Sequence, residues 1–177
     1  MPMSRLLTEK FLNKMDSDSR ILVYGYGNPG RQDDGLGAAF IQMLENWLIE
    51  NLFPQVSTDC NYQLNIEDAA AVSDKTLVVF VDASQEAIED YSFTKVEASD
   101  ARVEFSMHAV STSFVIDLCQ KIYGKVPEAW LLHIRGYEWD FKEELTQPAQ
   151  RNLELAFGFL TKFLDERRQE ILQSIEI

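Results

Sequence analysis

Two patterns of apolar positions alternate along the chain. Runs of consecutive apolar residues lie within 21–26 and 76–84, which is typical of strands covered on both faces. Between them, apolar positions spaced by three and four run from Leu36 to Leu48, which indicates one face of a helix. The opening unit is therefore a strand, a tight loop and a helix.

Further segments continue this alternation. A strand opens at 55–58, whereas 61–70 is compatible with a turn and a short helix. From Tyr91 apolar and polar residues alternate as in an edge strand, which 103–106 continues or pairs with. The remaining elements expected are a helix from Ser111 to Gly124, a strand over 129–139 and a last helix from near Thr146 and Pro148 through Leu164.

Alternating strands and helices predict an α/β fold, a three-layer domain whose twisted, mainly parallel sheet has helices on both faces. The 177 residues suffice for a single domain spanning 1–177. Within it we expect an amphipathic N-terminal helix extension over 1–20 and a core over 21–164. The tail, 165–177, extends the last helix or frays.

Composition narrows the class of protein. No apolar run approaches the roughly 18 residues that a membrane span needs, so we expect no membrane partner. Residues 1–20 lack the features of a secretory signal, and Cys60 and Cys119 read as free thiols, so we expect a cytoplasmic protein. A net charge of −13 disfavours a nucleic-acid partner. A monomer is expected.

Ligand sites in such sheets lie at the carboxyl ends of the strands. Three candidates fall there: the loop YGYGNPGRQDDG after the first strand, Asp82 at the end of a buried strand, and His108 in the loop before a helix.

The glycine loop admits a dinucleotide interpretation, because Gly25, Gly27 and Gly30 spell G-x-G-x-x-G. However, Asp33 and Asp34 would repel a pyrophosphate at the helix start, and Pro29 lacks a backbone N–H. The tetrapeptide GNPG also resembles the opening motif of peptidyl-tRNA hydrolase, but the histidine expected shortly after it is absent.

A third interpretation takes the acidic residues as the functional groups. Asp34, Asp82 and His108 would converge at one sheet edge as ligands of a divalent transition metal such as nickel or zinc, with open coordination positions. Asp33 is assigned to capping the helix, and His133 to a structural role within its strand. The residues expected to shape the loop are Gly25, Gly27, Asn28, Asp33 and Gly35.

Three segments in order, GYGNPGRQDDGLG, VVFVDAS and SMHAVSTSFVIDL, resemble the hydrogenase maturation endopeptidase family. The resemblance implies a phosphorylase/hydrolase-like fold and removal of a C-terminal extension from a [NiFe] hydrogenase large-subunit precursor after nickel insertion. It also implies Asp34, Asp82 and His108 as the metal-contacting and catalytic residues, with nickel supplied by the precursor. The later segment RGYEWDFKEELTQPAQRNLELA resembles the family's closing region and looks most like that of members serving bidirectional, NAD-reducing hydrogenases.

Hydrolysis in such a site proceeds by a metal-polarised carbonyl or by water activated on the metal or by a carboxylate, and the sequence leaves these routes open. No G-x-S-x-G and no H-E-x-x-H occurs, which argues against serine and thermolysin-type proteases. A different class also stays open: a non-catalytic metal-binding or chaperone-like module that docks on the precursor.

Overall fold

The structure is a computed structural model that describes residues 20–99 and 110–175. The predicted N-terminal helix, the predicted strand segment 103–106 and His108 lie outside the described residues.

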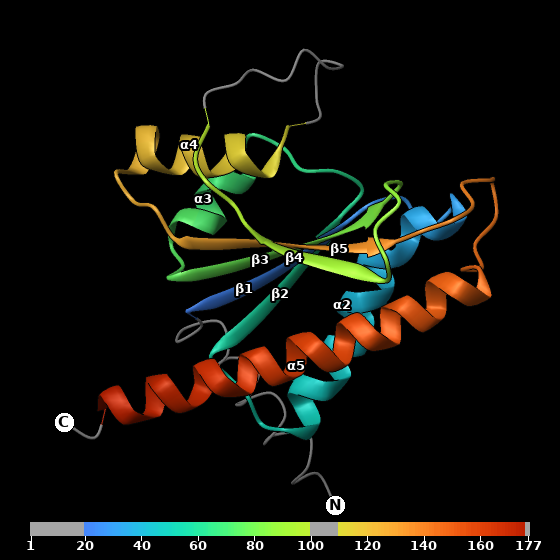
Figure 1. The fold of residues 1–177 in the computed structure, drawn as a ribbon. Helices are drawn as coiled ribbons and strands as arrows, with labels where there is room; N and C mark the ends of the chain where they lie inside the picture. Colours follow the sequence, from blue (N-terminus) through green and yellow to red (C-terminus); the bar gives the residue numbers. More distant parts are fainter. Residues whose placement is uncertain (1–19, 100–109, 176–177) are drawn as a thin grey trace, which may run out of the picture.

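A five-stranded sheet forms the centre of the molecule (Figure 1). Its order is β2-β1-β3-β5-β4, and only β4 runs antiparallel to its neighbour among these strands. The prediction of a mainly parallel sheet with an edge strand from Tyr91 is confirmed. The strands are β1 (Ile21–Tyr26), β2 (Val56–Asn61), β3 (Leu77–Ser84), β4 (Tyr91–Lys95) and β5 (Glu128–Arg135).

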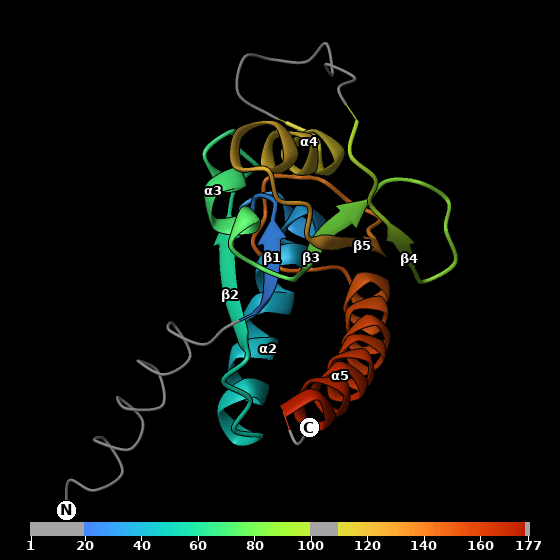
Figure 2. The same ribbon diagram turned by 90° about the vertical axis from the view of Figure 1, so that its left-hand side faces the viewer.

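Helices cover both faces of this sheet (Figures 1 and 2). Helices α2 and α5 lie on one face, and α3 and α4 lie on the other. This three-layer arrangement confirms the predicted α/β fold class. The helical elements are the 3-10 turn η1 (Gln32–Gly35), α2 (Leu36–Glu50), α3 (Asp68–Ser73), α4 (Thr112–Tyr123) and α5 (Gln147–Ile175).

Alternate residues of β1 enter two separate hydrophobic cores. Ile21 and Val23 pack in the core beneath α2 and α5, whereas Leu22 and Tyr24 pack in the core beneath α3 and α4. Side chains of a strand point alternately to opposite faces, so a strand buried on both faces is apolar at consecutive positions. This is the physical reason for the run ILVYGY.

The predicted ends of α4 are confirmed. Ser111 Oγ accepts a hydrogen bond from the Phe114 N–H at 3.1 Å, and Gly124 ends the helix with a left-handed φ of 64°. The prediction for the next strand was too long, because β5 ends at Arg135 and residues 136–139 form a loop.

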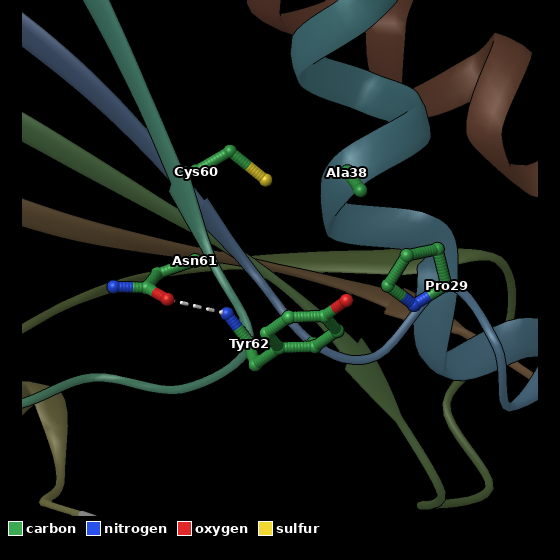
Figure 3. A pocket seen from close by; sticks show the side chains of 6 residues that line it. Pro29, Ala38, Cys60, Asn61 and Tyr62 are labelled. Atoms are coloured by element: carbon green, nitrogen blue, oxygen red, sulfur yellow. Dashed lines mark hydrogen bonds between the residues drawn. The ribbon is translucent and has the colours of Figure 1, made fainter.

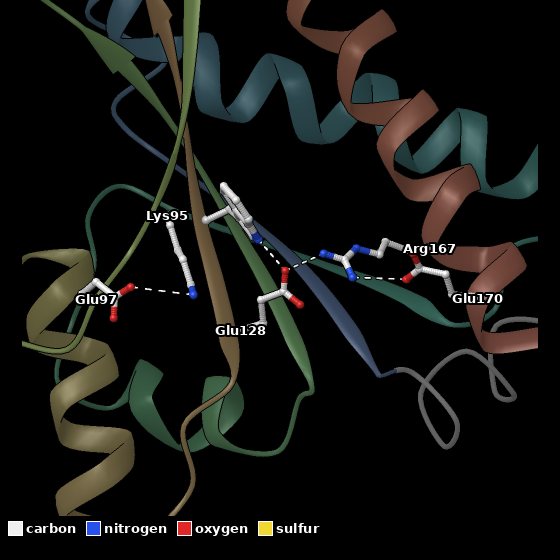
Figure 4. A network of polar contacts seen from close by, with 6 residues as sticks. Lys95, Glu97, Glu128, Arg167 and Glu170 are labelled. Carbon is white, nitrogen blue, oxygen red and sulfur yellow. Dashed lines mark hydrogen bonds and ion pairs between the residues drawn. The ribbon is translucent and has the colours of Figure 1, made fainter. Parts of the chain in front are cut away.

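Helix α5 is fixed to the amino end of β5 by a polar network (Figure 4). Glu128 accepts hydrogen bonds from Trp130 Nε1 at 2.8 Å and from Arg167 Nη2 at 2.5 Å. Beside it, the rings of Phe93 and Trp130 stack with centroids 4.7 Å apart, and Phe163 meets Phe93 edge-on. These contacts lie at the end of the sheet opposite to the candidate site. No helix in the described parts of the chain is long and apolar enough to cross a membrane.

Candidate functional site

The backbone N–H groups of the loop after β1 already donate hydrogen bonds to other atoms of the protein. From residue 27 to residue 34, every backbone N–H has an acceptor within the protein, and Pro29 has no N–H to donate. A pyrophosphate cradle needs N–H groups that point freely at the ligand, so this loop is unsuited to a dinucleotide. The acceptors, in chain order, are Asn61 O, Asp34 Oδ2, Asn28 Oδ1, Asn28 O, Lys142 O, Glu138 O and Arg31 O.

The loop holds one carboxylate at its centre. Asp34 Oδ2 accepts the Asn28 N–H at 2.9 Å, and the Asn28 side chain accepts the Gly30 N–H at 2.9 Å. No described residue donates a hydrogen bond to Asp34 Oδ1. Gly27 passes beneath this carboxylate with φ 130°, and a Cβ there would overlap Asp34 O. The loop therefore orients Asp34 through one oxygen and leaves the other available to a ligand.

Asp33 does not cap the helix that follows it, although the sequence predicted that it would. Its side chain is fully buried and makes no cap on its own helix. Instead it accepts four hydrogen bonds from a remote loop, namely the N–H groups of Tyr137 (2.8 Å), Glu138 (3.1 Å) and Thr146 (2.8 Å) and the Thr146 hydroxyl (2.8 Å). The capping interpretation is wrong because these donors, 104 to 113 residues away in the sequence, occupy both oxygens.

Asp82 lies in a row of polar side chains across three adjacent strands. It is the register partner of His133 on β5, and His133 Nε2 lies 3.8 Å from Asp82 Oδ2. On the other side, the hydroxyl of Tyr26 at the end of β1 lies near the same carboxylate. The Asp82 side chain retains 22% of its exposure, so it is reachable from the carboxyl edge of the sheet.

Burial dominates the electrostatics of this row. It raises the pKa of Asp82, while the neighbouring His133, the Ala83 backbone and Tyr26 partly oppose the rise. Burial, followed by the negative charge of Asp82, raises the pKa of the Tyr26 hydroxyl well above its ordinary value. The Tyr26 hydroxyl thus keeps its proton beside the carboxylate.

Asp34 and Asp82 come from neighbouring elements of the same sheet edge. Turn η1 follows β1 directly and lies against β3, and β1 and β3 are paired in parallel. Two carboxylates, of which Asp34 is oriented by a hydrogen bond from Asn28 and Asp82 lies between Tyr26 and His133, are suitable ligands for a divalent metal ion. Among the described residues no three ligand-type side chains form a cluster. The third expected ligand, His108, lies outside them.

Sequence reasoning did not foresee the partners of these residues. Placing Tyr26 and His133 beside Asp82 requires the strand order and register, which apolar patterns do not encode. Gln32 was likewise missed: it is only 6% exposed, has a left-handed φ of 52°, and donates from Nε2 to Glu138. A strained, buried polar residue inside a candidate loop is a recognised indication of function, but it is visible only in the structure.

Comparison with solved structures identifies the fold. No family model matches the chain, and no curated protein matches it in sequence. The [NiFe] hydrogenase maturation protease HycI from Thermococcus kodakarensis KOD1 is 20% identical, with a TM-score of 0.64 over 88% of this chain and 99% of its own. The hydrogenase maturating endopeptidase HybD from E. coli is 16% identical, with a TM-score of 0.66 over 84% of this chain and 93% of its own.

A third similar structure is the hydrogenase 2 maturation peptidase from Thaumarchaeota archaeon SCGC_AB-539-E09, which is 20% identical with a TM-score of 0.61. It matches over 83% of this chain and 99% of its own. The chain therefore has the fold seen in hydrogenase maturation proteases. The resemblance of three short segments to this family is matched by a similar fold over most of the chain.

Proposed function

We propose that this protein is a nickel-dependent endopeptidase that removes the C-terminal extension of a [NiFe] hydrogenase large-subunit precursor. The observation that carries the proposal is the glycine loop, whose N–H groups all donate to acceptors within the protein and whose Asp34 lies next to the strand that carries Asp82. The shared fold with maturation proteases adds to it. The cytoplasm, where such a precursor is made, is the proposed location.

In this proposal nickel belongs to the substrate, bound in the precursor near the bond to be cut. Asp34, Asp82 and the predicted third ligand His108 would complete its shell. A precursor without nickel gives these carboxylates no cation to bind, so the binding free energy that positions the peptide is lost. Nickel supplies Lewis-acid character next to the scissile bond.

The protein side chains would contribute orientation and proton transfer. Tyr26 and His133 lie on either side of Asp82, and the Asn28 N–H donates a hydrogen bond to Asp34. Hydrolysis adds one water across the peptide bond, leaving a new carboxylate and an amine that takes up a proton. A carboxylate at this edge is the natural acceptor and donor of the proton that moves.

Incubation with nickel-loaded and nickel-free precursor, followed by intact mass measurement, tests this proposal. We expect loss of a C-terminal peptide from the loaded form alone. Asp34→Asn, Asp82→Asn and His108→Ala should abolish processing while the melting temperature stays near that of the wild type. Glu154→Gln, an exposed change on α5, is the matched control and should process normally.

A non-catalytic docking module gives a different result. It would bind the loaded precursor without changing its mass, and the Asn variants would alter binding alone. Activity that merely follows the folded fraction of each variant would assign Asp34 and Asp82 to stability and overturn the proposed site.

A further inference from the structure

A small pocket opens next to the loop that carries Asp34 (Figure 3). Its volume is about 160 Å³. Three elements contribute to it: the glycine loop, the first turns of α2 and the end of the edge strand β2. Its lining residues are Gly27, Pro29, Ala38, Cys60, Asn61 and Tyr62.

The walls of the pocket are mostly apolar. The Pro29 ring, the Ala38 methyl group and the Tyr62 ring surround the opening in Figure 3, and Tyr62 is 67% exposed. The Cys60 thiol adds no charge, because partial desolvation of this exposed residue and then the charges of Asp59 and Glu45 raise its pKa. The same negative charges would repel an acidic ligand.

The pocket and the Asp34 carboxylate meet at Gly27. A Cβ on Gly27 would lie 3.5 Å from Asp34 Oδ1 and would overlap Asp34 O, so this lining residue of the pocket lies directly against Asp34. The Gly27 N–H also donates to Asn61 O at 3.1 Å, which fixes one wall of the pocket to the other. Successive residues of an extended peptide are about 3.3 Å apart, so a peptide at Asp34 can place a neighbouring side chain in this pocket.

Resting on the proposed endopeptidase function, we propose that this pocket is a specificity subsite for one uncharged, apolar side chain of the precursor, next to the bond that is cut. The volume agrees with this assignment, since a protein cavity of about 150 Å³ holds a benzene molecule. Side chains of the size of leucine, methionine or phenylalanine fit, whereas an acidic side chain would be repelled by Asp34 beside Gly27 and by Asp59 and Glu45 near Cys60.

The first test fills the pocket. Ala38→Leu keeps a good helix former in α2 but occupies the pocket, and we expect kcat/KM on the nickel-loaded precursor to fall at least about tenfold. Gln42→Leu, which adds a leucine at an exposed position of the same helix outside the pocket, is the matched control and should stay within about threefold of the wild type. Equal rates for all three proteins would overturn the subsite.

The second test does not depend on cleavage. Cys60 is exposed and Cys119 is buried, so N-ethylmaleimide should label Cys60 alone in the folded protein. A synthetic peptide spanning the precursor's cleavage site should slow this labelling, and the same peptide with aspartate at the apolar position next to the cut should not. Unchanged labelling with both peptides would contradict the inference, even if Ala38→Leu failed to fold.

The two proposals fail in distinguishable ways. Protection of Cys60 without any cleavage of loaded precursor would retain the subsite and reject the peptidase. Normal cleavage by wild type and Ala38→Leu, with Cys60 unprotected, would retain the peptidase and reject the subsite.

Discussion

Two adjacent aspartates in this chain have opposite environments. Asp33 is fully buried and has both oxygens occupied, whereas Asp34 is half-buried and has one oxygen held by Asn28. In a 3-10 turn successive side chains point in different directions, so neighbours in sequence can serve different regions. One residue therefore supports the loop and the next is left for a ligand.

Replacement of Asp33 should cost stability. Asp33→Asn exchanges an acceptor oxygen for an NH₂ group where every partner is a donor, so at least one buried N–H or hydroxyl loses its acceptor. We expect the free energy of unfolding to fall by about 2–4 kcal/mol. Urea denaturation measures the loss, and hydrogen exchange should accelerate at the amides of Tyr137, Glu138 and Thr146.

The neighbouring variant is the control for this prediction. Asp34→Asn retains an oxygen for the Asn28 N–H, so its stability should lie within about 1 kcal/mol of the wild type. Equal losses for both variants would contradict the separate roles assigned to these residues.

At the residue scale the sequence identified the acidic loop but not the contacts of its members. Local rules made a helix cap the best assignment for Asp33, because an aspartate at a helix start usually bonds to nearby amides. The true donors follow β5 near the other end of the chain. A contact over such a separation depends on the completed fold, which no local spacing encodes.

At the element scale, helix α5 is the longest element and one face of it is exposed. Gly158 lies on this face, and a Cβ there would meet no atom within 4 Å. Glycine costs a helix interior about 0.5–1 kcal/mol relative to alanine. Packing therefore does not require glycine at position 158.

Gly158→Ala should consequently stabilise the protein. We expect the free energy of unfolding to rise by about 0.5–1 kcal/mol, measured as an increase in the urea midpoint at unchanged slope. A decrease would show that the open space beside α5 is used by another part of the molecule.

Gly124→Ala provides the matched opposite. A Cβ at Gly124 also meets nothing within 4 Å, but the φ of Gly124 is 64°. Alanine there should lower the free energy of unfolding by about 1–2 kcal/mol, because only the left-handed backbone is unfavourable for it. Opposite changes in the free energy of unfolding for Gly158→Ala and Gly124→Ala would separate the effect of backbone conformation from that of packing.

Elements were predictable where the signal was local. Ser111 and Gly124 marked both ends of α4, and the apolar runs of β1 and β3 marked buried strands. The end of β5 was not predictable. The sequence pattern of the strand continues through Tyr137 and Glu138, but the N–H groups of these two residues donate hydrogen bonds to Asp33 instead of pairing in the sheet. Local propensity yields there to a tertiary contact.

At the scale of the whole molecule, a buried cysteine thiol makes the free energy of unfolding depend on pH. Burial raises the pKa of the Cys119 thiol from 9.0 to about 11, and its Sγ donates to Ala69 O. Between these values the unfolded chain has released the proton and the folded chain has kept it. Stability therefore falls as pH rises from 9 to 11.

Denaturation of wild type and Cys119→Ala at pH 8, 9, 10 and 11 isolates this contribution. The wild type should lose up to about 3 kcal/mol more than the variant over this range. Other titrating groups, such as Tyr24 and Cys60, are present in both proteins and cancel in the difference. Parallel curves would mean that the thiol is not shielded from water.

The bonds from Asp33 to Tyr137, Glu138 and Thr146 span 104 to 113 residues, and this separation has a consequence for the order of assembly during synthesis. A ribosome has made Asp33 and Asp34 long before it makes their supporting loop. Domains generally fold as units once their long-range partners are available. A chain interrupted before residue 137 thus leaves Asp33 without its four donors and the acidic loop unsupported. Under the proposed function, a chain that ends before these donors would have no peptidase activity.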